Sequence, residues 1–124
     1  MTMPGFVKFE VDKDLTQKTL EAIGLAKTSG KLRKGVNETT KALERGIAKF
    51  VVMAVDVTPE EVLMHVPVIC EEKNVPYSYV VSKLELGKAA GIEVPTSSIA
   101  VIEEGEAKKV IAEIAAKIKT LKGK

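Results

Sequence analysis

A carboxylate stands inside the most basic part of this sequence. Glu38 lies within Lys27–Lys49, where seven basic residues face two acidic ones, although the net charge of the whole 124-residue chain is only +2. A basic surface attracts phosphate, but phosphate attraction gives no reason for an acid at its centre. Carboxylates accept hydrogen bonds from the N–H groups of bases. We therefore expect this segment to read RNA bases as well as to bind the backbone.

An ordinary capped helix is the competing interpretation of these residues. Asn37 is a good N-cap residue, and Glu38 suits the positive end of the helix dipole. Lys41 and Arg45 then continue a solvated face that begins at Glu38. Cations crowd directly before this helix: Lys31, Arg33 and Lys34. Because the dipole does not stabilise cations there, the crowding favours a bound anion.

Apolar spacing predicts the elements that position these residues. A first helix begins after Asp12 and Asp14 and ends near Gly30. The helix from Asn37 has an apolar stripe with i, i+4, i+7 spacing: Leu43, Ile47 and Phe50. Further helices are expected from Thr58 to about Lys73 with an interruption at Pro67, from the Ser82–Glu85 capping box to Gly91, and from Ala107 to Leu121.

Four strands alternate with these helices. The continuous apolar run 50–55 is typical of a buried central strand. The other strands are expected over 31–34, 75–81 and 99–102. Strands alternating with helices predict an α/β fold, a three-layer α/β/α sandwich around a mixed four-stranded sheet. We expect residues 1–124 to form one domain, since the chain is of ordinary single-domain length.

Catalytic chemistry finds little support. His65 and Cys70 are the only residues of their types, and they face apart by about 140° if both lie on one helix. A lone histidine and a lone cysteine make a poor metal site, and Cys70 is better explained as a buried hydrophobe. No phosphate-binding loop or dinucleotide-binding fingerprint occurs. We expect a protein that is not an enzyme and that holds no metal or cofactor.

Composition bears on the cellular compartment of the protein. No run of about 18 apolar residues occurs, so we expect no membrane span. Met1–Gly5 lacks the charged and then apolar blocks of a secretory signal, and one cysteine suits a reducing interior. We therefore expect a cytoplasmic protein. Trp is absent, and Phe and Tyr are scarce, which argues against a sheet that stacks bases on aromatic side chains.

Several spaced motifs resemble one known family. They are Gly35–Lys41 followed by Arg45-Gly46, Cys70–Tyr77, Ser82-Lys83 with Leu86-Gly87, and Gly91–Pro95. In this order they are similar to the kink-turn-binding ribosomal proteins, with the archaeal large-subunit member as the nearest pattern. The resemblance runs from about Phe9 to the C-terminal helix.

The resemblance implies a site for sheared G·A pairs, whose guanines leave their Watson–Crick edges open. Glu38 would accept from the guanine N–H groups, while Asn37 and Lys41 would donate to O6. Gly35 would allow close backbone approach. Arg45, with Lys34 in support, would neutralise phosphates brought together by the bend.

The same resemblance implies a second half of the site. Ile92, Glu93 and Val94 would form a loop against a base flipped from the bulge, with Val62 near and Lys83 on the backbone. A loop whose apolar side chains are simply buried is the competing interpretation.

Partners are also implied by the resemblance. They are ribosomal RNA, box C/D and box H/ACA guide RNA, ribonuclease P RNA, and a Nop5-type core protein with fibrillarin. The protein would be a monomer when free. The alternative is a protein-interaction module of the same fold that binds no RNA and presents its acidic surface from residue 56 to residue 72.

Overall fold

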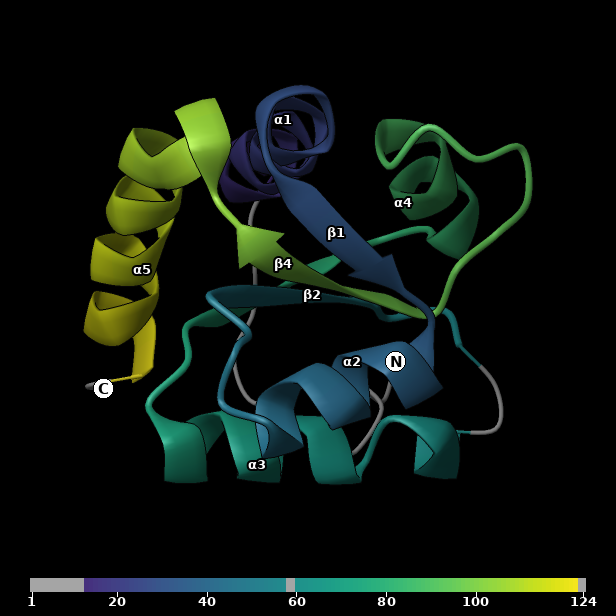
Figure 1. Ribbon diagram of the computed structural model, residues 1–124, viewed down its shortest axis with the longest axis vertical. Helices are drawn as coiled ribbons and strands as arrows, with labels where there is room; N and C mark the ends of the chain where they lie inside the picture. Colours follow the sequence, from purple (N-terminus) through teal and green to yellow (C-terminus); the bar gives the residue numbers. More distant parts are fainter. Residues whose placement is uncertain (1–12, 58–59, 123–124) are drawn as a thin grey trace.

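The computed structural model describes residues 13–57 and 60–122 (Figure 1). Four strands form the sheet: β1 (Lys31–Lys34), β2 (Phe50–Ala54), β3 (Tyr77–Val80) and β4 (Ser98–Glu103). Within the described ranges there are five α-helices: α1 (Lys13–Ser29), α2 (Val36–Glu44), α3 (His65–Lys73), α4 (Lys83–Ala89) and α5 (Lys108–Lys122). Two short 3₁₀ helices complete the order: η1 (Glu60–Val62) and η2 (Gly105–Ala107).

The sheet is mixed, with the strand order β1-β4-β2-β3. β4 runs antiparallel to both of its neighbours, whereas β2 and β3 are parallel. β2 is buried along its whole length, which confirms the expected central strand. Its continuous run of apolar residues follows from having helices on both faces of the sheet.

Helices cover both faces. α1 and α4 lie over one face and α2 and α3 over the other, and α5 packs beside α1 at the edge (Figure 1). The core between these layers includes Leu15, Ile23, Leu43, Phe50, Leu63, Tyr77, Tyr79, Leu86, Ile99 and Ile114, all of which are buried. The expected single α/β domain with a mixed four-stranded sheet is therefore confirmed.

The expected limits of α2 were wrong at both ends. Its N-cap is Gly35, and no side chain caps the helix, so Asn37 is not the cap residue. The helix starts early because the Gly35 N–H still bonds the Ser98 carbonyl of β4 at 2.8 Å, while its own carbonyl accepts from the Thr39 N–H at 3.0 Å. The chain thus passes from strand to helix within one residue.

The expected apolar stripe of Leu43, Ile47 and Phe50 was wrong, because α2 ends at Glu44, before Ile47 and Phe50. Gly46 has φ +71°, and the Ile47 N–H bonds the Ala42 carbonyl at 3.0 Å, which is a Schellman motif. Ile47 is consequently exposed beyond the helix, and Phe50 belongs to β2.

Pro67 does not interrupt a helix. The break lies before it, at Leu63 and Met64, between η1 and α3. Pro67 is the third residue of α3, within the first turn, where a missing N–H costs no intrahelical bond. The predicted start signal at Thr58 and Pro59 lies outside the described residues. The capping role of Ser82 is confirmed, since its hydroxyl accepts from the Leu84 and Glu85 N–H groups.

Candidate nucleic-acid interface

One end of the sheet collects four connecting segments. β1, β2 and β3 all finish there, and β4 starts there because it runs the opposite way. Hydrogen bonds tie the segments together: the Lys83 N–H donates to Asp56 Oδ1 at 2.9 Å, and the Thr96 N–H donates to the Lys83 carbonyl at 3.1 Å. These bonds hold the segments that follow β2 and β3 and the segment that precedes β4 in fixed positions relative to one another.

The first turn of α2 presents the central pair of predicted residues. Asn37 and Glu38 are both exposed. Because Gly35 and not Asn37 is the N-cap, the side-chain amide of Asn37 is not used to cap the helix and can face a ligand. The Glu38 carboxylate pairs with the Lys41 ammonium at 3.7 Å, one turn along the helix. Carboxylate, amide and ammonium thus lie on one exposed surface.

Gly35 sits in a backbone conformation reserved for glycine, with φ +94° and ψ 156°. A Cβ built on it would meet no atom within 4 Å. The glycine is therefore required by the backbone turn and not by packing inside the protein. The open space above it can receive a ligand close to the main chain.

The cations before α2 divide into two groups. Lys34 is exposed at the end of β1, opposite Ile99, next to Gly35. Lys31 lies at the other end of this strand, where its ammonium pairs with Glu103 at 3.4 Å. The expected crowding at the helix N-terminus is therefore wrong for Lys31.

Arg45 lies at the opposite end of α2 from Asn37 and Glu38. It is the C-cap of that helix, ten residues beyond Gly35, or about 15 Å along the axis at about 1.5 Å per residue. Asn37 and Glu38 lie in the first turn, so Arg45 is about 12 and about 10.5 Å from them along the axis. It is exposed and suits a more distant phosphate.

The loop before β4 carries the second predicted group. Val94 is 60% exposed and Glu93 is exposed, whereas Ile92 is half-buried. A Cβ on Gly87 would collide with the Val94 carbonyl oxygen, so Gly87 lets the loop lie directly on α4. The interpretation that the loop's apolar side chains are simply buried is therefore wrong for Val94.

Lys83 lies at the same end of the sheet as this loop, whereas Val62 lies in η1, between β2 and α3. Both side chains are half-buried, and Val62 packs against the core from η1. Lys83 starts α4 and is held through its backbone by Asp56 and Thr96.

Three buried hydroxyl residues beneath the site were not predicted. The Ser98 hydroxyl donates to Thr39 Oγ1 at 3.1 Å, and the Thr96 hydroxyl donates to the Ser98 carbonyl at 3.2 Å. Spacing offers a signal for Thr39 alone, since Val36, Thr39 and Leu43 follow i, i+3, i+7 on the inward face of α2. Ser98 and Thr96 stand at a strand start and in a loop, where no periodicity identifies them.

His65 and Cys70 have separate surroundings. His65 is exposed at the start of α3, where its Nε2 lies 2.8 Å from Thr40 Oγ1, and Cys70 is buried as expected. No group of three potential metal-binding side chains occurs within residues 13–57 and 60–122. Among the described helices, none has the length and hydropathy of a membrane span.

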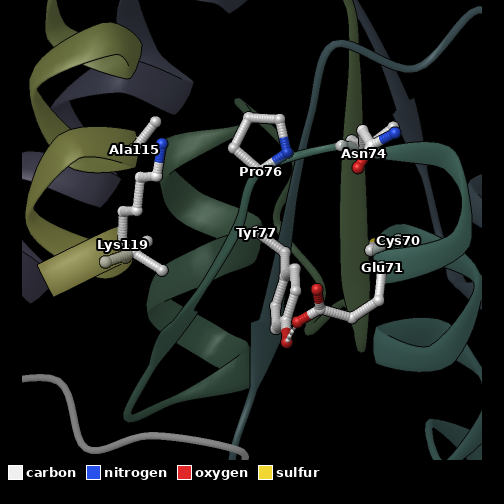
Figure 2. Close-up of a pocket in the computed structure, with 9 residues that line it drawn as sticks. Cys70, Glu71, Asn74, Pro76, Tyr77, Ala115 and Lys119 are labelled. Carbon is white, nitrogen blue, oxygen red and sulfur yellow. Dashed lines mark hydrogen bonds between the residues drawn. The ribbon is translucent and has the colours of Figure 1, made fainter. Parts of the chain in front are cut away.

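A separate cavity of about 370 Å³ lies between the end of α3, the start of β3 and α5 (Figure 2). The Tyr77 hydroxyl donates to Glu71 at 2.7 Å on its wall. Burial, together with this hydrogen bond, raises the pKa of Tyr77 far above its ordinary range. β3 starts at Tyr77 and finishes at the end of the sheet where Gly35 and Asn37 lie. The cavity is therefore at the opposite end of the sheet from those two residues. No predicted site residue lines it.

Comparison with known proteins agrees with this architecture. The structure is similar to the Giardia lamblia 15.5kD RNA binding protein, with a TM-score of 0.85 and 32% sequence identity. The alignment covers 97% of this chain and 99% of that one. Residues 17–111 match the ribosomal protein L7Ae/L30e/S12e/Gadd45 family. The chain belongs to this family, and its membership agrees with the expectation of a protein that is not an enzyme.

Proposed function

We propose that this protein binds RNA and recognises kink-turns, the sharply bent elements that contain tandem sheared G·A pairs. The observation that carries the proposal is the first turn of α2. There the exposed side chains of Asn37, which does not cap the helix, and of Glu38 follow Gly35, whose backbone has open space above it. Membership of a ribosomal protein family and likeness to an RNA-binding protein support it.

Base reading follows from matching donors to acceptors. A sheared guanine offers N1–H and N2–H₂ as donors and O6 as an acceptor. Glu38 accepts from those donors, while Asn37 and Lys41 donate to O6. The Glu38 carboxylate has more than one acceptor site, so its surface pair with Lys41 does not exclude the guanine.

Backbone binding comes from the cations around this turn. Lys34 stands beside Gly35, Lys83 lies at the start of α4, and Arg45 lies at the far end of α2. Their separation suits a bent RNA whose phosphates reach both ends of α2. These contacts supply affinity, whereas Asn37 and Glu38 supply preference for one RNA shape.

The loop of Ile92, Glu93 and Val94 completes the site against a base flipped out of the bulge. The exposed Val94 supplies apolar contact, and the half-buried Ile92 and Val62 are the further apolar residues assigned to this base. RNA readout at unstacked bases is the usual pattern for sequence-dependent recognition.

The biological setting extends the proposal. The closeness of the motifs to the archaeal large-subunit member suggests a cytoplasmic protein of the large ribosomal subunit. It suggests further roles in box C/D and box H/ACA guide particles and in ribonuclease P. Partners there are a Nop5-type core protein and, through it, fibrillarin, and the unbound protein is a monomer.

A protein-interaction module without RNA is the second candidate. One observation favours it: Met64 and Val68 are 39% and 51% exposed beside Glu61 and Glu72 on the acidic surface. Exposed large apolar side chains with a charged surround are typical of contact surfaces.

One titration decides between the two candidates. Binding is measured to a kink-turn RNA and to a matched RNA whose G·A pairs are changed to Watson–Crick pairs. We expect a clear preference for the kink-turn at one fixed salt concentration. Equal affinity for both RNAs would refute base reading, and binding to neither would favour the protein-interaction module.

A further inference from the structure

Ser98 joins the two halves of the candidate site from below. It is fully buried at the start of β4. Its carbonyl accepts from the Gly35 N–H at 2.8 Å and from the Thr96 hydroxyl at 3.2 Å, and its own hydroxyl donates to Thr39 at 3.1 Å. One residue therefore holds the start of α2, the interior of α2 and the end of the 92–97 loop.

These bonds determine where the exposed groups stand. Thr39 is buried on the inner side of α2, directly after Asn37 and Glu38 in the sequence. Fixing Thr39 to the sheet fixes the rotation of the first turn about the helix axis. Recognition sites depend on positions held within about 0.5 Å, which exposed side chains cannot provide by themselves.

We propose that Ser98 is a positioning residue for RNA recognition, although it touches no RNA. Its hydroxyl orients the base-reading turn through Thr39, and its carbonyl sets the spacing to the loop through Thr96. This inference rests on the proposed function, because the quantity it controls is the preference for sheared G·A pairs.

The chain contains a matched control on the opposite face of the sheet. Thr19 of α1 and Ser78 of β3 are also buried, and their hydroxyl oxygens lie 3.1 Å apart. Because the Thr19 hydroxyl donates to the Leu15 carbonyl at 2.8 Å, Ser78 is the donor to Thr19, as Ser98 is to Thr39. Both pairs thus join a helix threonine to a strand serine, but only one lies beneath the candidate site.

The test compares Ser98→Ala with Ser78→Ala in the full chain. Each variant leaves a buried threonine oxygen without its serine donor, so we expect similar losses in melting temperature. Ser98→Ala should lower the ratio of affinities for kink-turn over Watson–Crick RNA about five- to tenfold. Ser78→Ala should leave that ratio unchanged.

Two Thr39 variants add a rescue. Thr39→Val keeps the shape but removes the acceptor, so it should reproduce Ser98→Ala. Thr39→Ser keeps the acceptor and should retain the wild-type ratio that Thr39→Val loses. Thr96→Val removes the loop bond and should instead weaken preference among bulge bases.

The outcomes separate this inference from the proposed function. A wild-type preference that survives unchanged in Ser98→Ala, or that falls equally in Ser78→Ala, would overturn the positioning role alone. A wild-type protein without any preference would overturn the proposed function and, with it, the part of Ser98 in recognition. Amide exchange without RNA gives a further reading: the Thr39 N–H should exchange faster in Ser98→Ala than in Ser78→Ala.

Discussion

The Glu38 carboxylate lies 3.7 Å from the Lys41 ammonium, one turn apart on the exposed surface of α2. Exposed pairs of this kind contribute only about 0.3–0.5 kcal/mol, so a ligand can reorganise this one at little cost. The pair also keeps an acceptor and a donor side by side. A guanine edge requires both groups, and a phosphate requires only the donor.

Lys34→Ala should weaken binding to all RNAs by a similar factor, because phosphate contacts carry no sequence information. The dependence of log K on log salt concentration should lose about one unit of slope. Titrations at several salt concentrations measure this. Lys31→Ala is the control, since Lys31 pairs with Glu103 at the other end of β1. Equal slope changes in the two variants would contradict the assignment.

Gly35→Ala should cost about 1–3 kcal/mol of stability, because φ +94° with ψ 156° is a conformation that alanine avoids. At a temperature where the variant is still folded, its preference for kink-turn RNA should fall at least about tenfold, since Cβ enters the space above the turn.

Gly46→Ala serves as its control. Gly46 also has a positive φ and open surroundings, but it lies at the other end of α2. Thermal melts should show a loss of stability there too, while the preference between the two RNAs remains. An unchanged preference in Gly35→Ala would argue against close RNA approach at this glycine.

Val94→Ser should reduce affinity about three- to tenfold for RNA with a bulged base, because it removes apolar contact. The loss should disappear with RNA in which this nucleotide is abasic. Val68→Ser, on α3, is the control for replacing an exposed valine. Should the abasic RNA show the same loss as the intact one, Val94 would not contact the base.

Tyr77→Phe should change alkaline stability and not RNA binding. Burial raises the pKa of Tyr77 in the folded protein. Above the ordinary tyrosine pKa of about 10, the hydroxyl therefore loses its proton in the unfolded state but keeps it in the folded state, which favours unfolding. Stability of the wild type should therefore fall with increasing pH from about 10 upwards. Chemical denaturation across pH 8–11 should show a shallower decline in the phenylalanine variant. A parallel decline would contradict the predicted contribution of Tyr77.

Much of the fold could be predicted from local patterns. The run 50–55 indicated a buried strand, and Ser82 indicated the start of α4, because each signal involves neighbouring residues. The limits of α2 could not be predicted in this way. The Gly35 N–H is held by Ser98, more than sixty residues away, and that long-range bond moved the cap from Asn37 to Gly35.

The candidate site was predicted in its exposed part and missed in its buried part. Charge and motif identified Asn37, Glu38 and the 92–94 loop, which share one end of the sheet. The supporting hydroxyl of Ser98 leaves no charge or periodic signal. Lys31 was assigned to the wrong end, because strand direction separates it from Lys34 by the length of β1.

Glu38→Ala is the sharpest test of whether Glu38 reads bases. Affinities of the wild type and variant are measured for kink-turn RNA and for its Watson–Crick counterpart at one salt concentration. We expect kink-turn binding to fall by about tenfold or more and the preference to vanish, because unpaired guanine donors are costly. Removing a negative charge from a merely basic surface would have the opposite effect. Stronger binding of Glu38→Ala to both RNAs would therefore contradict base reading by Glu38.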